Sequence, residues 1–112
     1  MAHMFRSSRE VIIRTEAWDE AVKFYESVLG LPVTLRTETM LGFETGAFCL
    51  YIEKGHEHAP VFEFLVADLQ AAKHRLIDAG CVVQEENSDF PRCYIRDPFG
   101  VVFNLAQTRT DG

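Results

Sequence analysis

Apolar and polar residues follow one order of patterns in the first half of the chain. Residues 11–15 are mostly β-branched, which predicts a strand. Apolar residues recur at helical spacing from Trp18 to Leu29, and Gly30 followed by Pro32 predicts the end of that helix. Further strands are predicted at 33–36, 42–44 and 47–53. The first half is therefore predicted to fold as β-α-β-β-β.

The second half repeats this order. The apolar run 61–66 predicts a strand. Asp68 is a favourable N-cap for a helix whose apolar stripe includes Leu69 and Leu76 and which ends at Gly80. Strands follow at 81–84, 92–96 and 101–106, and the last two are joined by the turn Asp97-Pro98-Phe99-Gly100.

The two halves match at one offset over their first part. An offset of 50 residues places Val11 on Val61 and Gly30 on Gly80. We therefore expect residues 1–112 to form one domain of two modules, the first at about 9–53 and the second at about 60–106.

Composition narrows the classes of partner. The chain has 11 Lys and Arg against 17 Asp and Glu, a net charge of −6. This balance argues against binding to nucleic acid or to an anionic membrane surface. No apolar run approaches the roughly 20 residues of a membrane span. The three cysteines show no CxxC spacing, which is typical of reduced thiols in a cytoplasmic protein.

Three segments resemble signatures of one known superfamily. Phe24-Tyr25 with Leu29-Gly30-Leu31 is similar to a first-module signature of the vicinal oxygen chelate superfamily, which holds glyoxalase I, bleomycin resistance proteins and extradiol dioxygenases. The closing motif of that superfamily is similar to Asp97-Pro98-x-Gly100 followed by Asn104-Leu105, and Val66-x-Asp68-Leu69 fits its second-module helix. The resemblance covers residues 9 to 106.

The resemblance implies an α+β fold. Two βαβββ modules would form a curled mixed sheet around a cleft, with one helix of each module on the outer face. It also implies a homodimer whose clefts bind a small molecule.

The resemblance further implies where a catalytic metal would bind. Metal-dependent members place His, Gln or Glu at four inward positions, which fall here on Glu10, Leu50, Val61 and Asn104. Leu50 and Val61 carry no donor atom, whereas a catalytic metal needs about three protein ligands. We therefore expect neither a metal nor another cofactor.

Alternation along the strands predicts which side chains face the cleft. The predicted ligand-binding set is Glu10, Ile12, Arg14, Phe43, Phe48, Leu50, Glu63, Tyr94 and Asn104. A register error of one residue would instead turn inward the set Cys49, Tyr51 and Glu53.

The charges in this set have two interpretations. Glu10, Glu63 and Arg14 could form an internal salt bridge or lie at an exposed rim. Alternatively, the carboxylates could form an acidic pocket for a cationic group, with aromatic walls.

Three functions follow as hypotheses. The first is a metal-independent binding protein that resembles bleomycin resistance proteins and sequesters a cationic or aromatic ligand, as in antibiotic resistance. The second is a lyase or isomerase with Glu63 or Glu10 as general base, or with Glu10, Glu63 and Asn104 as a non-standard metal set. The third is a non-catalytic regulatory domain with an empty cleft.

Overall fold

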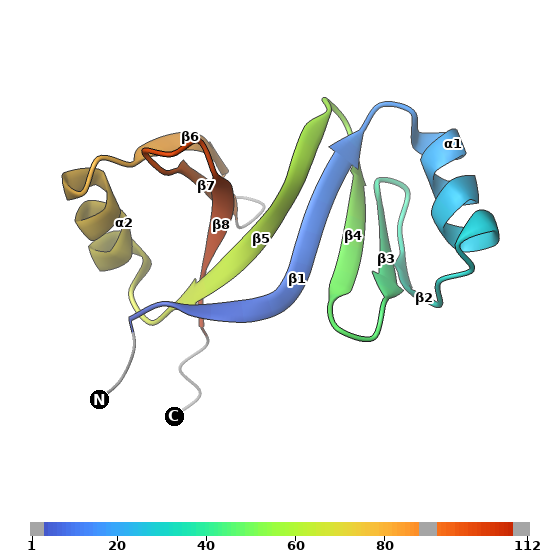
Figure 1. Cartoon of the computed structure of the whole chain (residues 1–112), viewed down its shortest axis with the longest axis horizontal. Helices are drawn as coiled ribbons and strands as arrows, with labels where there is room; N and C mark the ends of the chain where they lie inside the picture. The colour runs from blue at the N-terminus through green and yellow to red at the C-terminus, as the bar shows by residue number, and fades with distance from the viewer. Residues whose placement is uncertain (1–3, 88–91, 109–112) are drawn as a thin grey trace. The chain divides into compact units, whose positions relative to one another are not determined.

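The order of secondary-structure elements is the same in the two halves of the chain (Figure 1). The computed structural model describes residues 4–87 and 92–108. The first half contains β1 (Arg6–Thr15), α1 (Trp18–Lys23), the π-helical turn η1 (Phe24–Val28), β2 (Val33–Arg36), β3 (Met40–Glu44) and β4 (Cys49–Lys54). The second half contains β5 (His58–Val66), α2 (Leu69–Asp78), β6 (Val82–Asn87), β7 (Arg92–Arg96) and β8 (Val102–Gln107).

The chain divides into two compact units. Unit one comprises residues 9–61, and unit two comprises the remaining described residues. Each unit carries one helical segment, and the α+β class predicted from the sequence is confirmed. Neither helix in the described part of the chain has the length and apolar character needed to cross a membrane.

Unit one buries one face of a four-stranded sheet under α1 and η1. The strand order is β2-β3-β4-β1, with β1 and β4 parallel and the other pairs antiparallel. The centre of this core is Leu41, Phe43, Leu50 and Ile52, and apolar side chains from the helical segment and β1 pack against it. The amphipathic helix therefore covers the face to which β3 and β4 point these four residues.

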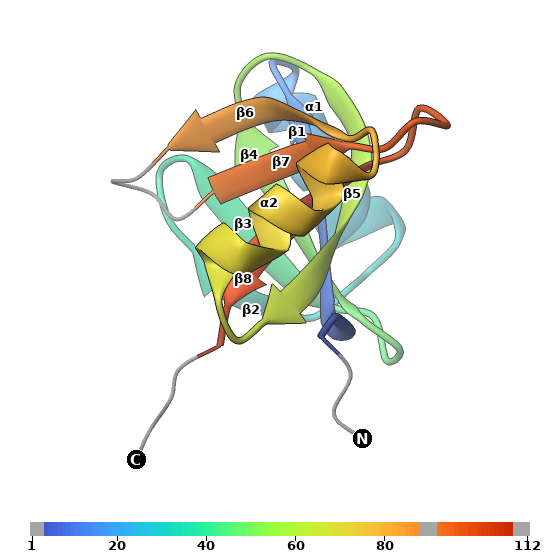
Figure 2. The same ribbon diagram turned by 90° about the vertical axis from the view of Figure 1, so that its left-hand side faces the viewer.

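Unit two is built in the same way. Its strand order is β5-β8-β7-β6, with β5 and β8 parallel. The Asp68 carboxylate caps α2 by accepting the Ala71 N–H at 3.1 Å. In Figure 2, α2 lies against β7 and β8. Its Leu69, Ala72 and Leu76 pack on the buried cluster Val66, Cys81, Cys93, Ile95, Phe103 and Leu105.

One extra residue in the first helical segment changes the offset between the halves. The first strand ends at Thr15 in unit one and at Val66 in unit two, an offset of 51, but Gly30 and Gly80 differ by 50. The π-helical turn absorbs this residue, with the Leu29 N–H donating to the Phe24 carbonyl at 2.9 Å. The expected match of Val11 with Val61 is therefore wrong by one position.

Candidate functional site

The sheet face away from the helix carries most of the predicted ligand-binding residues. In β1, Val11 and Ile13 pack in the core of unit one. Because strand side chains alternate, Glu10, Ile12 and Arg14 point to the opposite face. Their partners on β4 are Cys49, Tyr51 and Glu53.

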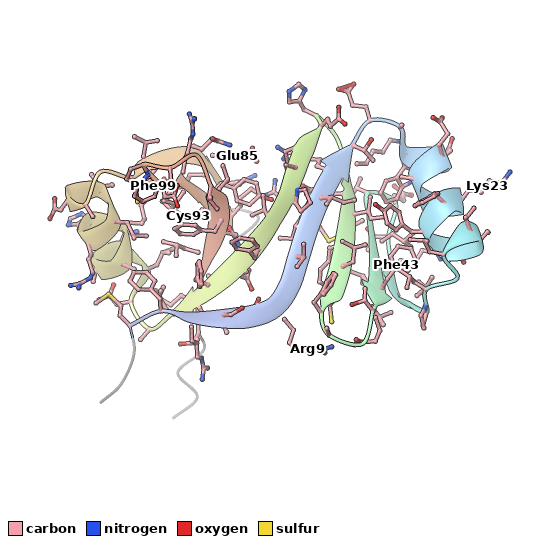
Figure 3. The ribbon with its side chains drawn as sticks, in the orientation of Figure 1. Arg9, Lys23, Phe43, Glu85, Cys93 and Phe99 are labelled. Atoms are coloured by element: carbon pink, nitrogen blue, oxygen red, sulfur yellow. The ribbon has the colours of Figure 1, made fainter. Side chains whose placement is uncertain are left out.

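Two predicted ligand contacts lie in the core instead. Phe43 is fully buried, and Leu50 is 9% exposed in the same cluster. Figure 3 shows Phe43 between β3 and α1, and its ring centroid lies 6.1 Å from that of Tyr25. The register that turns Cys49, Tyr51 and Glu53 away from the helix is the correct one for β4. Phe48 lies in the turn before β4 and is 37% exposed.

Arg14 is held by groups of unit one. Its guanidinium lies 3.6 Å from the Glu53 carboxylate, and its Nε donates to the His56 carbonyl at 2.8 Å. Both side chains of the ion pair are only 14% exposed. Within unit one, Arg14 therefore forms a salt bridge with Glu53, a carboxylate outside the expected group of Glu10, Glu63 and Arg14.

An aromatic ring fills the middle of the same face in unit one. Tyr51 pairs with Gly42, and a Cβ at Gly42 would lie 2.9 Å from Cε1 of Tyr51. The ring therefore lies directly against the glycine backbone. With Ile12 beside Tyr51 on β1 and Leu35 opposite Gly42 on β2, this part of the face is apolar or aromatic.

The same face of unit two is polar. Asn104 Nδ2 donates to the Glu63 carboxylate at 2.8 Å, and Asn104 Oδ1 accepts the Cys93 N–H at 2.9 Å. The backbone donor fixes which end of the amide is oxygen, so the NH₂ group must point to Glu63. Asn104 is 4% exposed. Glu63 is half-buried.

A second group of side chains extends this polar face. Arg92 pairs with Glu85 at 3.0 Å, and its guanidinium carbon lies 5.1 Å from the centroid of the Tyr94 ring. Tyr94 itself pairs with Asn104 across β7 and β8. Because Tyr94 is only 1% exposed, its ring is not the open aromatic wall that the sequence suggested.

Sequence reasoning missed Glu85 and Arg92. Arg92 lies two residues before Tyr94 on the same strand, so alternation could have placed it on this face. Glu85 follows a shift in register between Val83 and Glu85, where a β-bulge reverses the expected alternation.

The donor atoms do not fit a catalytic metal. Of the four positions that the superfamily pattern indicates, Leu50 lies in the core and Val61 is a buried hydrocarbon side chain. Both ends of the Asn104 amide are engaged. Across residues 4–87 and 92–108, no three His, Cys, Asp or Glu side chains gather closely enough to hold a metal ion.

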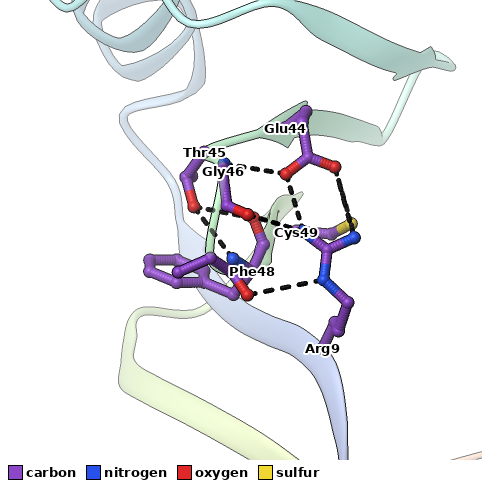
Figure 4. Close-up of polar contacts among 7 residues, drawn as sticks. Arg9, Glu44, Thr45, Gly46, Phe48 and Cys49 are labelled. Atoms are coloured by element: carbon purple, nitrogen blue, oxygen red, sulfur yellow. Dashed lines mark hydrogen bonds and ion pairs between the residues drawn. The ribbon is translucent and has the colours of Figure 1, made fainter.

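Another polar cluster has a structural explanation. Arg9 donates to the Glu44 carboxylate at 2.7 Å and to the Gly46 carbonyl at 3.2 Å, which ties β1 to the β3–β4 turn (Figure 4). The hydrogen bond from Arg9 lowers the pKa of Glu44, and the same pairing raises the pKa of Arg9. Burial raises the pKa of the Cys81 and Cys93 thiols, which makes them poor nucleophiles.

Comparison with known proteins supports this architecture. A family model described as Glyoxalase-like domain matches residues 10–106. A glyoxalase/bleomycin resistance protein/dioxygenase superfamily member from Vibrio splendidus 12B01 is similar over 93% of this chain and 99% of its own, with 16% identity and a TM-score of 0.66.

Two further solved structures have similar scores. Homoprotocatechuate 2,3-dioxygenase from Brevibacterium fuscum is similar over 95% of this chain but 37% of its own, with 19% identity and a TM-score of 0.67. A hypothetical protein from Bacillus halodurans C-125 is similar over 98% of this chain and 99% of its own, with 10% identity and a TM-score of 0.65. No curated protein sequence matches the chain. At these identities the likeness shows the fold alone.

Proposed function

The chain belongs to the glyoxalase-like domain family, and we propose that it is a metal-independent protein that binds a small cationic or aromatic molecule through Glu63. The observation that carries the proposal is the 2.8 Å hydrogen bond from the Asn104 amide to the Glu63 carboxylate. A buried amide that orients a half-buried carboxylate prepares that carboxylate to receive a ligand group. Sequestration of the ligand is the role we propose.

The topology itself does not need this polar pair. Glu63 and Asn104 are neighbours on the parallel strands β5 and β8. In unit one the corresponding neighbours on β1 and β4 are Ile12 and Tyr51. Burying a polar group costs free energy unless hydrogen bonds compensate it, and a partly buried carboxylate costs more than a neutral group. The pair in unit two is therefore better explained by binding than by folding.

The charge of the cluster favours a cationic ligand group. Glu85 and Arg92 neutralise each other at 3.0 Å, and Asn104 is neutral. The Glu63 carboxylate therefore gives this group of four side chains a net charge of about −1. A cation that contacts Glu63 would balance it, and the chain's net charge of −6 would steer such a molecule toward the protein.

Metal independence follows from the donor set. Of the four expected ligand positions, Val61 offers only carbon, Leu50 points into the core, and the amide of Asn104 is committed to Glu63 and Cys93. No contact among the described residues favours the alternative of a lyase or isomerase with Glu63 or Glu10 as general base. Glu10, Ile12, Arg14 and Phe48 remain predicted ligand contacts in unit one.

The test is a Glu63→Gln variant in a ligand titration. Glutamine keeps the shape of the side chain and an oxygen that can accept the Asn104 N–H, but it removes the charge. Binding of phenethylammonium and benzyltrimethylammonium is measured by calorimetry, with 2-phenylethanol as the neutral analogue. We expect the Kd of the cations to rise about ten-fold or more in Glu63→Gln, because both cations lose the opposite charge that pairs with them.

An Asp78→Asn variant is the matched control. Asp78 ends α2 in the same unit and is exposed, so its loss removes one negative charge away from the polar face. Cation affinity should stay within about two-fold of wild type, because an exposed charge is screened. Equal affinity of wild type and Glu63→Gln for every cation would contradict the proposal, as would no saturable binding of any of them.

Two expectations from the sequence remain predictions. One is the homodimer, which the molecular mass in solution at micromolar concentration checks. The other is a cytoplasmic location, which fractionation of the source cell checks.

A further inference from the structure

Unit one contains a hollow that shares no residue with the polar cluster of unit two. It is a half-open depression of about 230 Å³ between α1 and the β2–β3 turn. Trp18 and Val22 supply its apolar surface, above the buried Leu41. Figure 1 shows the two elements that border it, α1 and the hairpin of β2 and β3, within this unit.

The rim of the hollow carries net negative charge. Asp19 and Glu38 line it together with Arg36. The Arg36 guanidinium is already paired with Glu26 at 2.8 Å. In the described part of the chain, the side chains of Asp19 and Glu38 make no hydrogen bond or ion pair. Two uncompensated carboxylates therefore flank one apolar hollow.

The rim is held in place by hydrogen bonds of the turn. The Thr37 N–H donates to the Met40 carbonyl at 2.8 Å, and the Met40 N–H donates to Thr37 Oγ1 at 2.9 Å. These bonds fix the backbone that carries Glu38. The floor is equally fixed, because Leu41 is fully buried in the core. The hollow is thus formed before any ligand arrives, which lowers the entropic cost of binding.

We propose that this hollow binds a small organic ammonium ion, with the Trp18 ring against the ammonium group and Asp19 and Glu38 balancing its charge. Aromatic rings attract ammonium groups, and tryptophan does so most strongly. The volume is below the roughly 300–1,000 Å³ of sites for drug-sized ligands, so the occupant is a compact cation. The site shares no residue with the Glu63 cluster, so it stands independently of the function proposed above.

Trp18 provides the measurement, because it is the single tryptophan of the chain. Choline is titrated against the protein while Trp18 fluorescence and the indole N–H resonance are followed. The control ligand is 3,3-dimethylbutan-1-ol, which has the shape of choline with carbon in place of the charged nitrogen. We expect a saturable change with choline at a Kd on the order of millimolar, and at least about five-fold weaker binding of the alcohol.

Variants of the rim test the role of charge. Asp19→Asn with Glu38→Gln should weaken choline binding about ten-fold, since each exposed carboxylate contributes modestly. Glu20→Gln is the matched control, because Glu20 is exposed on the same turn of α1 and does not line the hollow. Its Kd should stay within about two-fold of wild type.

Each other outcome overturns the proposal. These outcomes are no saturable change up to about 100 mM choline at constant ionic strength, an equal response to the neutral alcohol, and an unchanged Kd in the double rim variant. Glu63→Gln should leave the Trp18 response intact. Loss of that response in Glu63→Gln would assign choline binding to the polar cluster of unit two and overturn the hollow as its site.

Discussion

The two units share one topology but differ on the sheet face that the helix leaves uncovered. At four structurally matched positions, unit one carries two aliphatic residues, a glycine and a tyrosine, whereas unit two carries two glutamates, a tyrosine and an asparagine. Ile12 of unit one matches Glu63 of unit two, and Leu35 matches Glu85. Gly42 matches Tyr94, and Tyr51 matches Asn104. Unit one thus shows that this fold forms without the polar network of unit two.

Both units nevertheless fit one tyrosine at the middle of this face. In unit one the ring comes from β4, and glycine opposite it makes room. In unit two the ring comes from β7, and Asn104 lies opposite it. The middle of the face therefore holds one aromatic ring in each unit, beside a glycine in unit one and beside an asparagine in unit two.

The largest effect should come from the cores that the units have in common. Phe43 and its counterpart Ile95 are both fully buried. We expect Phe43→Ala to lower the free energy of unfolding by about 3–5 kcal/mol and Ile95→Ala by about 2–5 kcal/mol. Denaturant unfolding measures both, and Phe48→Ala, at an exposed position, is the control. Similar losses in Phe43→Ala and Phe48→Ala would place Phe43 outside the core.

Removing Asn104 should come next. Asn104→Ala leaves the Cys93 N–H without its acceptor and Glu63 without its donor, so we expect a loss of about 2–3 kcal/mol. A double-mutant cycle with Glu63→Ala isolates the pair, with an expected coupling of about 1–3 kcal/mol. Additive losses in that cycle would show that the two side chains are energetically independent.

The packing of Tyr51 on Gly42 predicts a smaller loss. Gly42→Ala places a methyl group 2.9 Å from the tyrosine ring, and we expect about 1–3 kcal/mol of destabilisation. Tyr51→Leu should relieve this crowding, so Gly42→Ala should cost less in that background. An equal cost of Gly42→Ala in both backgrounds would mean that the ring does not crowd this glycine.

The smallest effect concerns pH and the exposed turn of unit one. The hydrogen bond from Arg9 lowers the pKa of Glu44. The stabilisation of the folded state by this pair is therefore fully present above the usual pKa range of a carboxyl group, and it is lost as the pH falls through the lowered pKa. The stability difference between wild type and Arg9→Met should be constant between about pH 5 and 7 and shrink in more acidic solution. A difference that grew on acidification would contradict this sign.

The sheet face away from the helix could be predicted from sequence only in strands where polar and apolar side chains alternate. In β8, Asn104 stands between Phe103 and Leu105, so alternation placed all three correctly. In β4, both faces carry apolar or aromatic side chains, so alternation could not tell Leu50 from Tyr51. The sequence signals that predict helices and strands are local, whereas the burial of Leu50 depends on the helix packed above it.

The candidate site was predicted only in part for the same reason. Glu63 and Asn104 are polar residues within apolar strands, and that contrast identified them. The pairing of Arg92 with Glu85 depends on a bulge in β6. No residue type in that strand predicts the bulge. The hollow at Trp18 lies between α1 and a turn that is distant in the sequence, and the periodicity of apolar residues does not predict which distant segments meet.

The π-helical turn in the first half has a consequence for tracing the ancestry of the two units. An alignment that is anchored on Gly30 and Gly80 and carries their offset of 50 back through the helix to β1 matches Glu63 with Ile13 instead of Ile12. Because Ile13 lies in the core and Ile12 does not, such an alignment reverses inside and outside along the whole strand. Placing the gap within Phe24–Val28 restores the correspondence. A duplicated gene can thus gain or lose a codon inside a helix while the strands before and after it keep their faces.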